Sequence, residues 1–361
     1  MRKRKLLLLF AAVLLIAAGV VFYFRFHPAV YPKLSWLYGK EISVTASENL
    51  EGTTVLASEF SQGNLVYSSS MGLTLSPKNV LDFHFINPKM QKAGDYLLAY
   101  DHQGTSASVF YKNKELYTVE TEHNILNAKV NDEGYLAVIS EQLGYQGMVT
   151  VYNRKGKSVY KVYSGEKFLL DADVMGNGKR LAVCQYDTAG DALTSSISFY
   201  QLDQNEAYAV AQTTETTLVN IRFLSNGKLL AIGENMAIGF SSDGEESWRY
   251  SYDGASLQNY SVSGSNAAAL VLRQQNQKIV ILHQNGSSHV YSYEGADIKE
   301  IVNNKNGVLF GTTRDVLFLN NRAYLVAQLQ VSRDVAALHM AEKGLSGAVL
   351  YESGYDLVKV K

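Results

Sequence analysis

Cysteine and proline are scarce in this chain of 361 residues. The single cysteine, Cys184, excludes an internal disulfide, and its alternating position in the run RLAVCQY predicts a buried, inert thiol. Two of the four prolines, Pro28 and Pro32, stand in one short segment that predicts a stiff spacer. Because no long amphipathic helical pattern follows residue 40, we expect strands and tight turns there.

Neither sign of charge is in excess, since 33 Lys and Arg face 34 Asp and Glu. A net charge of −1 gives no electrostatic basis for binding nucleic acid, so we expect no nucleic-acid partner. Charged residues make up only 19% of the chain, whereas Tyr (24) and Gly (28) are abundant. That composition favours strands and turns over helices.

The motifs of common catalytic and cofactor sites are missing as well. No GxSxG, GxxxxGK[ST] or GxGxxG stands in a strand–turn–helix setting, and no HExxH is present. His283 and His289 flank an NG turn without a carboxylate or thiolate to complete a metal set, so the histidines are interpreted as structural or surface residues. A calcium loop starting at Asp171 in DADVMGNGK would have Met175 at its fifth position and Ala182 at its twelfth, where oxygen ligands are needed, so the run predicts a turn. We therefore predict no cofactor, no metal and no enzymatic activity.

The dominant pattern in the chain is an internal repeat. Similar turn-and-strand motifs recur at Gly63, Gly94, Glu133, Gly178, Gly227, Asn266, Gly307 and Gly347. Successive copies are separated by roughly 40 residues, and each unit contains four short apolar-alternating runs. This period is typical of a β-propeller, in which neighbouring blades bury the two faces that an isolated blade would expose.

The repeat predicts an all-β propeller of eight four-stranded antiparallel blades over residues 41–361. Seven blades is the alternative, because the copy at Gly63 is degenerate. The last copy lacks a fourth strand, and we expect the run from Glu41 to Ser47 to supply it from the other end of the chain. Such pairing would close the ring and remove two open sheet edges.

The N-terminus has the pattern of a membrane anchor. Leu6 to Phe24 contains 19 residues without a charge, which is about 28 Å of helix and close to the hydrocarbon thickness of a bilayer. The basic run MRKRK before it predicts a cytoplasmic N-terminus. A cleaved signal peptide is the alternative, but the stretch ends in aromatics and Arg25 without a small-x-small site.

The predicted organisation follows from these two patterns. Residues 1–5 form a cytoplasmic tail, 6–24 a transmembrane signal-anchor helix, 25–40 a juxtamembrane linker and 41–361 an extracytoplasmic propeller. We therefore expect a single-pass protein of the cell membrane whose C-terminal domain is extracellular.

Two sets of polar or aromatic residues are candidate sites. Loops between second and third strands are long at 141–147 and 187–195, and long loops on a rigid scaffold carry binding residues. The candidates there are Tyr145, Gln146, Asp187 and Asp191, although tolerated surface insertions would give the same pattern. First strands line the central channel of a propeller, where the candidates are Asp171, Asp173, Asn220 and Arg222. They would form either an acid/base set or a hydrated lining.

The blocks GDYLLAYDHQG, ILNAKVNDEGYLAVIS and LLDADVMGNGKRLAVCQYD resemble a family of uncharacterised Gram-positive proteins. Its members have a basic N-terminus, one membrane span and an exported propeller classed as a domain of unknown function. The resemblance covers the anchor and roughly residues 60–320, and it transfers no catalytic residue. More distantly, LLAIGENMAIGFSSDGEESWRYSY is similar to quinoprotein-like and WD-like repeats. In quinoprotein-like repeats a blade-end Trp docks on the neighbouring blade, and Trp248 occupies that place.

The leading hypothesis from the sequence is a membrane-tethered binding or scaffolding propeller. Its partners would be the lipid bilayer, through Leu6 to Phe24, and an envelope protein or glycan. The alternative is a hydrolase, lyase or quinone-dependent enzyme with its site at the central channel.

Overall fold

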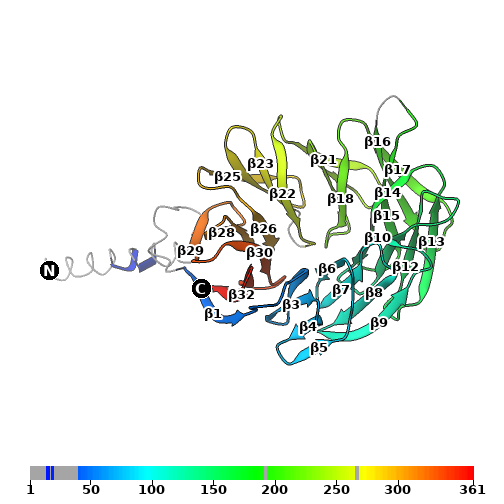
Figure 1. The fold of residues 1–361 in the computed structure, drawn as a ribbon. Helices are drawn as coiled ribbons and strands as arrows, with labels where there is room; N and C mark the ends of the chain where they lie inside the picture. The colour runs from blue at the N-terminus through cyan, green and yellow to red at the C-terminus, as the bar shows by residue number, and fades with distance from the viewer. Residues whose placement is uncertain (1–13, 17, 20–39, 191–192, 265–267) are drawn as a thin grey trace.

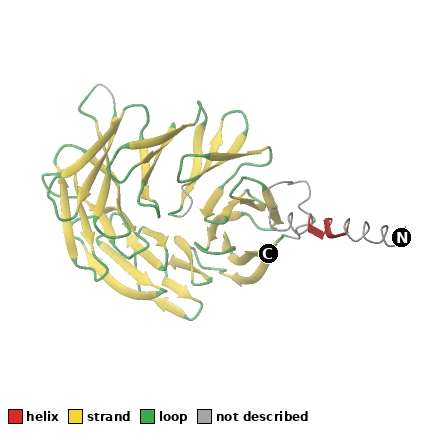
Figure 2. Ribbon diagram, turned by 180° about the vertical axis from the view of Figure 1, so that it is seen from behind, coloured by secondary structure: helices red, strands yellow, loops and turns green. Residues whose placement is uncertain are grey.

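The computed structural model describes residues 14–16, 18–19, 40–190, 193–264 and 268–361. From residue 42 to residue 360, the described residues build eight four-stranded antiparallel sheets arranged as the blades of a ring (Figure 1). All regular structure in the described part of this ring is strand, as the colouring of Figure 2 shows. The prediction of an all-β, eight-bladed propeller is confirmed, and the seven-bladed alternative is excluded.

The first four blades follow one another along the chain. Blade 1 contains β2 (Ala57–Ser61), β3 (Asn64–Ser69), β4 (Gly72–Ser76) and β5 (Asn79–Leu81). Blade 2 contains β6 (Pro88–Ala93), β7 (Tyr96–Asp101), β8 (Ser106–Tyr111) and β9 (Lys114–Glu120). Blade 3 contains β10 (Ile125–Val130), β11 (Leu136–Ser140), β12 (Gly147–Tyr152) and β13 (Ser158–Ser164). Blade 4 contains β14 (Phe168–Val174), β15 (Arg180–Asp187), β16 (Thr194–Gln201) and β17 (Ala207–Thr213).

The remaining blades continue the series, and the last one joins both ends of the ring. Blade 5 contains β18 (Leu218–Phe223), β19 (Leu229–Gly233), β20 (Met236–Phe240) and β21 (Glu246–Ser251). Blade 6 contains β22 (Ser256–Val262), β23 (Ala268–Arg273), β24 (Gln277–Leu282) and β25 (Ser288–Tyr293). Blade 7 contains β26 (Glu300–Asn304), β27 (Gly307–Gly311), β28 (Asp315–Asn320) and β29 (Leu325–Gln330). Blade 8 contains β30 (Val335–Met340), β31 (Ser346–Tyr351), β32 (Gly354–Val360) and β1 (Ile42–Asn49).

Strand β1 closes the ring from the other end of the chain. It pairs antiparallel with β32, from Ile42 opposite Val360 to Asn49 opposite Gly354. Figure 1 shows β1 and β32 side by side next to the C-terminus. The strand predicted at Glu41 to Ser47 is therefore confirmed in place and role, and its ends differ by one or two residues.

The strand period explains how every blade packs on two neighbours. Side chains along a strand alternate between the two faces of its sheet. In β11, Leu136 and Val138 belong to the core shared with blade 2, whereas Ala137 and Ile139 belong to the core shared with blade 4. One such apolar cluster lies between each pair of neighbouring blades, including blades 8 and 1. The ring is therefore held by a repeated inter-blade core.

Aromatic side chains on the outer strands add a second inter-blade contact. Trp248 of β21 donates its indole N–H to the carbonyl of Gln284 in blade 6 at 3.3 Å, and its ring lies against Gly286. The docking role expected for Trp248 is confirmed. Tyr160 of blade 3 and Tyr208 of blade 4 make equivalent hydroxyl bonds to carbonyls of the next blade, at 2.6 and 2.7 Å. Tyrosine thus replaces tryptophan in other units, which explains some of its abundance.

The ring has two distinct faces. We call the face with the first-to-second and third-to-fourth turns the turn face, and the opposite one, with second-to-third loops and inter-blade connections, the loop face. The chain enters the ring on the turn face. Ile42 pairs with Val360, and the Val360 N–H bonds to the carbonyl of Leu345 in the turn between β30 and β31.

The N-terminal prediction falls largely on residues that the structure does not describe. Among the described residues, no helix is long and apolar enough to cross a membrane. The predicted span from Leu6 to Phe24 lies outside the described residues, except for positions 14–16 and 18–19.

Candidate functional site

The first candidate site lies on the loop face of blades 3 and 4. Tyr145 stands in the loop between β11 and β12, and 49% of its side-chain surface is exposed. Its ring centroid lies 5.1 Å from that of Tyr163, near the end of β13. The loop is tied to β13 by the Gln146 N–H, which donates to the carbonyl of Ser164 at 2.8 Å. Tyr145 and Gln146 are therefore both exposed on a loop with a fixed position.

Further apolar side chains are exposed around this loop. Phe168, at the start of β14, stacks on Tyr186 of β15 at 5.3 Å and remains partly exposed. Leu143 and Leu193, in the two long loops, are 81% and 41% exposed. We call the following residues the loop-face patch: Leu143, Tyr145, Tyr163, Phe168 and Leu193. Apolar side chains gathered in this way on one face are typical of interaction sites.

The two aspartates predicted in the second long loop add little to the loop-face patch. Asp187 is half-buried at the end of β15, and its carboxylate accepts the N–H of Ala189 at 2.8 Å, so it stabilises its own turn. Asp191 lies outside the described residues. The sequence reasoning identified Tyr145 but missed Leu143, Tyr163 and Phe168. Apolar residues inside or beside an unusually long loop were the available signal.

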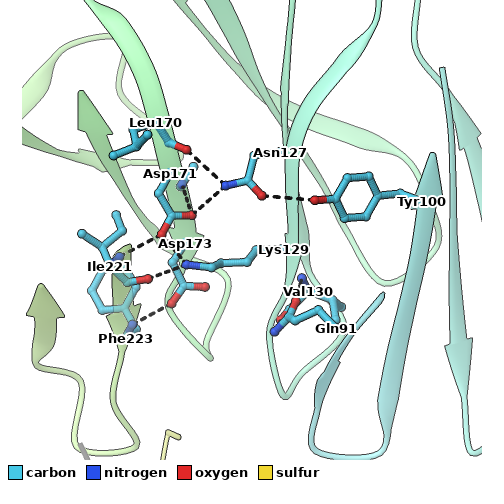
Figure 3. Close-up of polar contacts among 11 residues, drawn as sticks. Gln91, Tyr100, Asn127, Lys129, Val130, Leu170, Asp171, Asp173, Ile221 and Phe223 are labelled. Atoms are coloured by element: carbon cyan, nitrogen blue, oxygen red, sulfur yellow. Dashed lines mark hydrogen bonds and ion pairs between the residues drawn. The ribbon is translucent and has the colours of Figure 1, made fainter. Parts of the chain in front are cut away.

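The second candidate site lies at the central channel, where Asp171 forms a buried ion pair (Figure 3). Its carboxylate lies 2.5 Å from the ammonium of Lys129 and accepts the N–H of Ile221 at 2.8 Å. Lys129 also donates to the carbonyl of Ile221 at 2.6 Å. Because Lys129 belongs to blade 3, Asp171 to blade 4 and Ile221 to blade 5, this pair joins three blades. The two charged groups therefore hydrogen-bond the backbone N–H and carbonyl of Ile221, at the inner edge of β18, with which no other described strand pairs.

Asp173 lies two residues after Asp171 on the same face of β14, and it too binds the backbone of β18. It accepts the N–H of Phe223 at 2.6 Å and is 2% exposed. Burial raises the pKa of its carboxyl group, against the opposing charges of Arg222 and Lys129. Asp173 and the half-buried Arg222 line a cavity of about 560 Å³ on the turn face.

Asn220 directly precedes Ile221 on β18 and is half-buried. It pairs with Ile232 of β19 in the strand register, while Asp171 and Asp173 accept the N–H groups of Ile221 and Phe223, which flank Arg222. The structure therefore brings the four predicted channel residues together between blades 4 and 5. Both carboxylates already accept backbone hydrogen bonds there.

Several residues of this network were missed in the sequence. Asn127 donates to the carbonyl of Leu170 at 3.1 Å and to Asp171 at 3.2 Å, and it accepts the hydroxyl of Tyr100 at 3.4 Å (Figure 3). Gln91 of blade 2 bonds both backbone groups of Val130 in blade 3. The signal that could have found them was a polar side chain in a first strand, Gln91 in KMQKA and Asn127 in ILNAKV.

A third polar cluster joins blades 1 and 8. Ser58 Oγ lies 2.8 Å from His339 Nε2, and Glu59 Oε2 lies 3.8 Å from His339 Nδ1. Burial lowers the pKa of His339 to about 4. Burial also raises the pKa of Glu59 to about 7, against the lowering effect of Lys92. The groups follow the order of a nucleophile, a base and an acid, but Glu59 lies beyond hydrogen-bond distance of His339.

No cluster of three or more metal-ligating side chains occurs within the described ranges. Cys184 of β15 is 1% exposed, and burial raises the pKa of its thiol, which agrees with the predicted inert role.

Eight four-stranded blades around a central channel place this chain in the β-propeller class. Residues 44–359 match a family of unknown function (DUF5711), and the chain belongs to that family. This agrees with the resemblance noted in the sequence to a propeller family without assigned activity. No curated protein matches the chain.

Solved structures share the fold at very low sequence identity. The C-terminal WD40 domain of Sif2 is 11% identical with a TM-score of 0.63, over 89% of this chain and 99% of that one. BamB from Moraxella catarrhalis is 9% identical with a TM-score of 0.57, over 88% of this chain and 99% of that one. The computationally designed Ika8 protein is 14% identical with a TM-score of 0.60, over 90% of this chain and 100% of that one. These likenesses show the fold alone.

Proposed function

We propose that this chain is a membrane-tethered propeller that binds an envelope component, protein or glycan, through the loop-face patch. The observation that carries the proposal is the exposure of apolar side chains on one face, led by Leu143 at 81% and Tyr145 at 49%. Tyrosine and phenylalanine rings contribute large apolar contact areas and stack on rings or sugar faces. The propellers that the chain resembles are compatible with such a binding role but do not define a partner.

The rigidity of the site supports this proposal. The long loop is fixed to β13 through Gln146, and Tyr145 and Phe168 each stack on a neighbouring ring. A surface that is ordered before binding loses less conformational entropy when the partner arrives.

The tether is the second element of the proposal and is motivated by the uncharged run from Leu6 to Phe24. We propose N-in, C-out insertion without cleavage, which places the ring outside the cell. A tag at the C-terminus should then be removed by protease added to intact protoplasts. A tag that survives while other surface proteins are digested would contradict this orientation, and a mature N-terminus near residue 30 would support a cleaved signal peptide.

Site-specific crosslinking tests the binding site. A photo-crosslinking amino acid replaces Leu143 in the patch or, as a control, Val290 on outer strand β25, which is 50% exposed. In the native envelope we expect a defined crosslinked product from position 143 only. The product should disappear when Tyr145→Ser and Phe168→Ser are added. Equal products from both positions, or persistence in the double variant, would refute the patch as the binding site.

A second candidate function, hydrolysis by acyl transfer, is favoured by the Ser58–His339–Glu59 cluster. Ser58 Oγ would attack an acyl carbonyl and pass its proton to His339 Nε2, which would give it to the leaving alcohol or amine as its bond to the acyl carbon breaks. Water, deprotonated by His339, would then hydrolyse the acyl-serine ester, and the proton would return to Ser58. A pKa of about 4 makes His339 a weak base, so binding remains the leading function. Labelling of the wild type by a fluorophosphonate, and its loss in Ser58→Ala, would favour the enzyme. Absence of labelling would dismiss this cluster.

A further inference from the structure

Exposed lysines gather on the turn face of blades 8, 1, 2 and 3, among fewer exposed carboxylates such as Asp95 and Asp132, and the net charge of −1 conceals this cluster. We call six exposed lysines in or directly beside turns of the turn face the basic arc. They are Lys78, Lys112, Lys114, Lys155, Lys157 and Lys343. The loop face instead exposes carboxylates in its loops and connections, among them Glu122, Glu141, Glu166, Asp253, Asp297 and Glu352. The cluster spans consecutive blades, since the basic arc runs over blades 8, 1, 2 and 3.

The lysines of the basic arc are largely free of counter-charges. Lys112 lies 3.6 Å from Asp95, in a pair in which both side chains are half exposed. The other five lysines form no ion pair with any residue that the structure describes. Of the carboxylates near the arc, Glu133 is paired with Arg154, whereas Asp132 and Glu342 form no ion pair with a described residue and reduce the local positive charge. The arc is therefore available to an external anion.

The arc also lies where the chain enters the ring. Ile42 begins β1 opposite Val360, and Val360 is bonded to Leu345, two residues from Lys343. The predicted linker, residues 25–40, therefore ends at one end of the basic arc. A tether to a membrane would bring this face, rather than the loop face, near the bilayer surface.

We propose that the basic arc docks the turn face on anionic phospholipid headgroups of the membrane. The orientation rests on the proposed tether, while the docking itself does not require it. Each lysine within a Debye length of an anionic surface raises binding about fivefold at moderate salt. The acidic loop face is repelled by the same surface, so the loop-face patch would point away from the membrane towards its partner.

Vesicle binding by the isolated ring tests the proposal. Residues 40–361 contain all eight blades and the closing strand β1, so this fragment has every contact that closes the ring. We expect it to co-sediment with vesicles of phosphatidylglycerol and phosphatidylcholine but not with phosphatidylcholine alone. Binding should fall steeply between about 0.1 M and 1 M salt, where the Debye length shrinks from about 10 to 3 Å. Equal binding to both vesicles would overturn the proposal.

Charge reversal with a matched control separates the arc from net charge. The variant Lys114→Glu, Lys155→Glu, Lys157→Glu should bind anionic vesicles at least about 100-fold more weakly, since about fivefold is lost per lysine. The control Lys89→Glu, Lys161→Glu, Lys299→Glu changes the net charge equally but lies outside the arc, on exposed positions. We expect the control to retain most of the binding. A similar loss in both variants would refute a specific docking face.

The orientation is measured with a dye on an introduced cysteine. Pro77→Cys lies on the turn face and Gln275→Cys on the loop face, and both positions are exposed, whereas the native Cys184 is buried. A quencher attached to lipid headgroups should quench the dye at position 77 only. Equal quenching, or quenching at position 275, would overturn the proposed orientation. Salt-sensitive binding to a soluble anionic polymer without headgroup quenching would assign the arc to that polymer and refute lipid docking.

Failure of the docking proposal is distinguishable from failure of the tether. If the full chain resists alkaline extraction from membranes but the ring ignores anionic vesicles, the tether stands and docking fails. If the ring binds the vesicles but the full chain is extracted at high pH, docking stands and the tether fails.

Discussion

The substitution Lys129→Met tests whether the channel network holds the ring together. Lys129 and Asp171 have only 11% and 2% of their side-chain surface exposed. Removing the ammonium would leave the buried carboxylate without its counter-charge. It would also remove the donor to the carbonyl of Ile221. Methionine keeps most of the aliphatic volume, so the change is mainly electrostatic.

The magnitude follows from the burial of the pair. Breaking a buried ion pair by removing one partner costs about 3–5 kcal/mol, because the remaining charge is uncompensated. A chain of this size has an unfolding entropy near 0.7 kcal/mol/K, so each kcal/mol lowers the melting temperature by about 1.5 °C. We therefore expect the melting temperature to fall by about 5–7 °C. The double variant Lys129→Met, Asp171→Asn should lose less, since the buried charge is removed as well.

Fluorescence melting of residues 40–361 provides the assay. Trp248 is the only tryptophan in that range and lies between blades 5 and 6. Hydrogen exchange at the Ile221 amide gives a local readout, and we expect it to accelerate in Lys129→Met. The control Lys161→Met, at an exposed position of β13, should change stability by less than about 0.5 kcal/mol. If Lys129→Met shifted the melting temperature no more than this control, the ion pair would not stabilise the contact between the three blades.

Three further predictions concern other regions of the ring. Deleting Val358–Lys361 should destabilise the whole ring, because it removes apolar core and reopens the edges of blade 8; an unchanged melting temperature would contradict closure through β1. Tyr160→Phe should cost about 1 kcal/mol through the lost hydroxyl bond to blade 4, measured by urea unfolding, and no change would show that the bond contributes nothing. The pKa of Glu59 is raised from 4.5 to about 7, so this group makes the folded state less stable as pH rises from 4.5 to 7. The pKa of His339 is lowered from 6.5 to about 4, so this group makes the folded state more stable as pH rises from 4 to 6.5. In Glu59→Gln only the second effect remains, so melting temperature should rise more steeply from pH 4 to 6.5 than in the wild type, and an identical profile would refute the opposed pair.

Because Asp171 holds three blades together, substituting it is a poor test of catalysis in the central channel. Loss of activity in Asp171→Ala would follow from disruption of three blades as readily as from chemistry, because Asp171 contacts Lys129 and Ile221. Asp173 lines the turn-face cavity and makes one backbone bond, to Phe223. Asp173→Asn is therefore the more informative variant for an acid/base role in the channel.

The sequence alone determined the local architecture of this protein. Each blade is a series of antiparallel hairpins between neighbouring residues, so the period of roughly 40 residues and the turn motifs were sufficient to predict four strands per blade and eight blades. The closing strand was also predictable, because the last unit lacked one strand and a single unassigned run remained at Glu41. The docking role of Trp248 was an expectation from the resemblance to quinoprotein-like repeats, and its bond to Gln284 agrees with it.

The tertiary structure decided which distant residues meet. Lys129, Asp171 and Ile221 come from successive blades, and only the packing of these blades in the closed ring brings them within hydrogen-bond distance. The same closure places turns from blades 8, 1, 2 and 3 on one surface and so collects their lysines into the basic arc. Segments of the turn face and of the loop face alternate along the chain, so their basic and acidic residues are mixed in the sequence. The lysines come together only because the first-to-second and third-to-fourth turns of all blades lie on the same side of the ring.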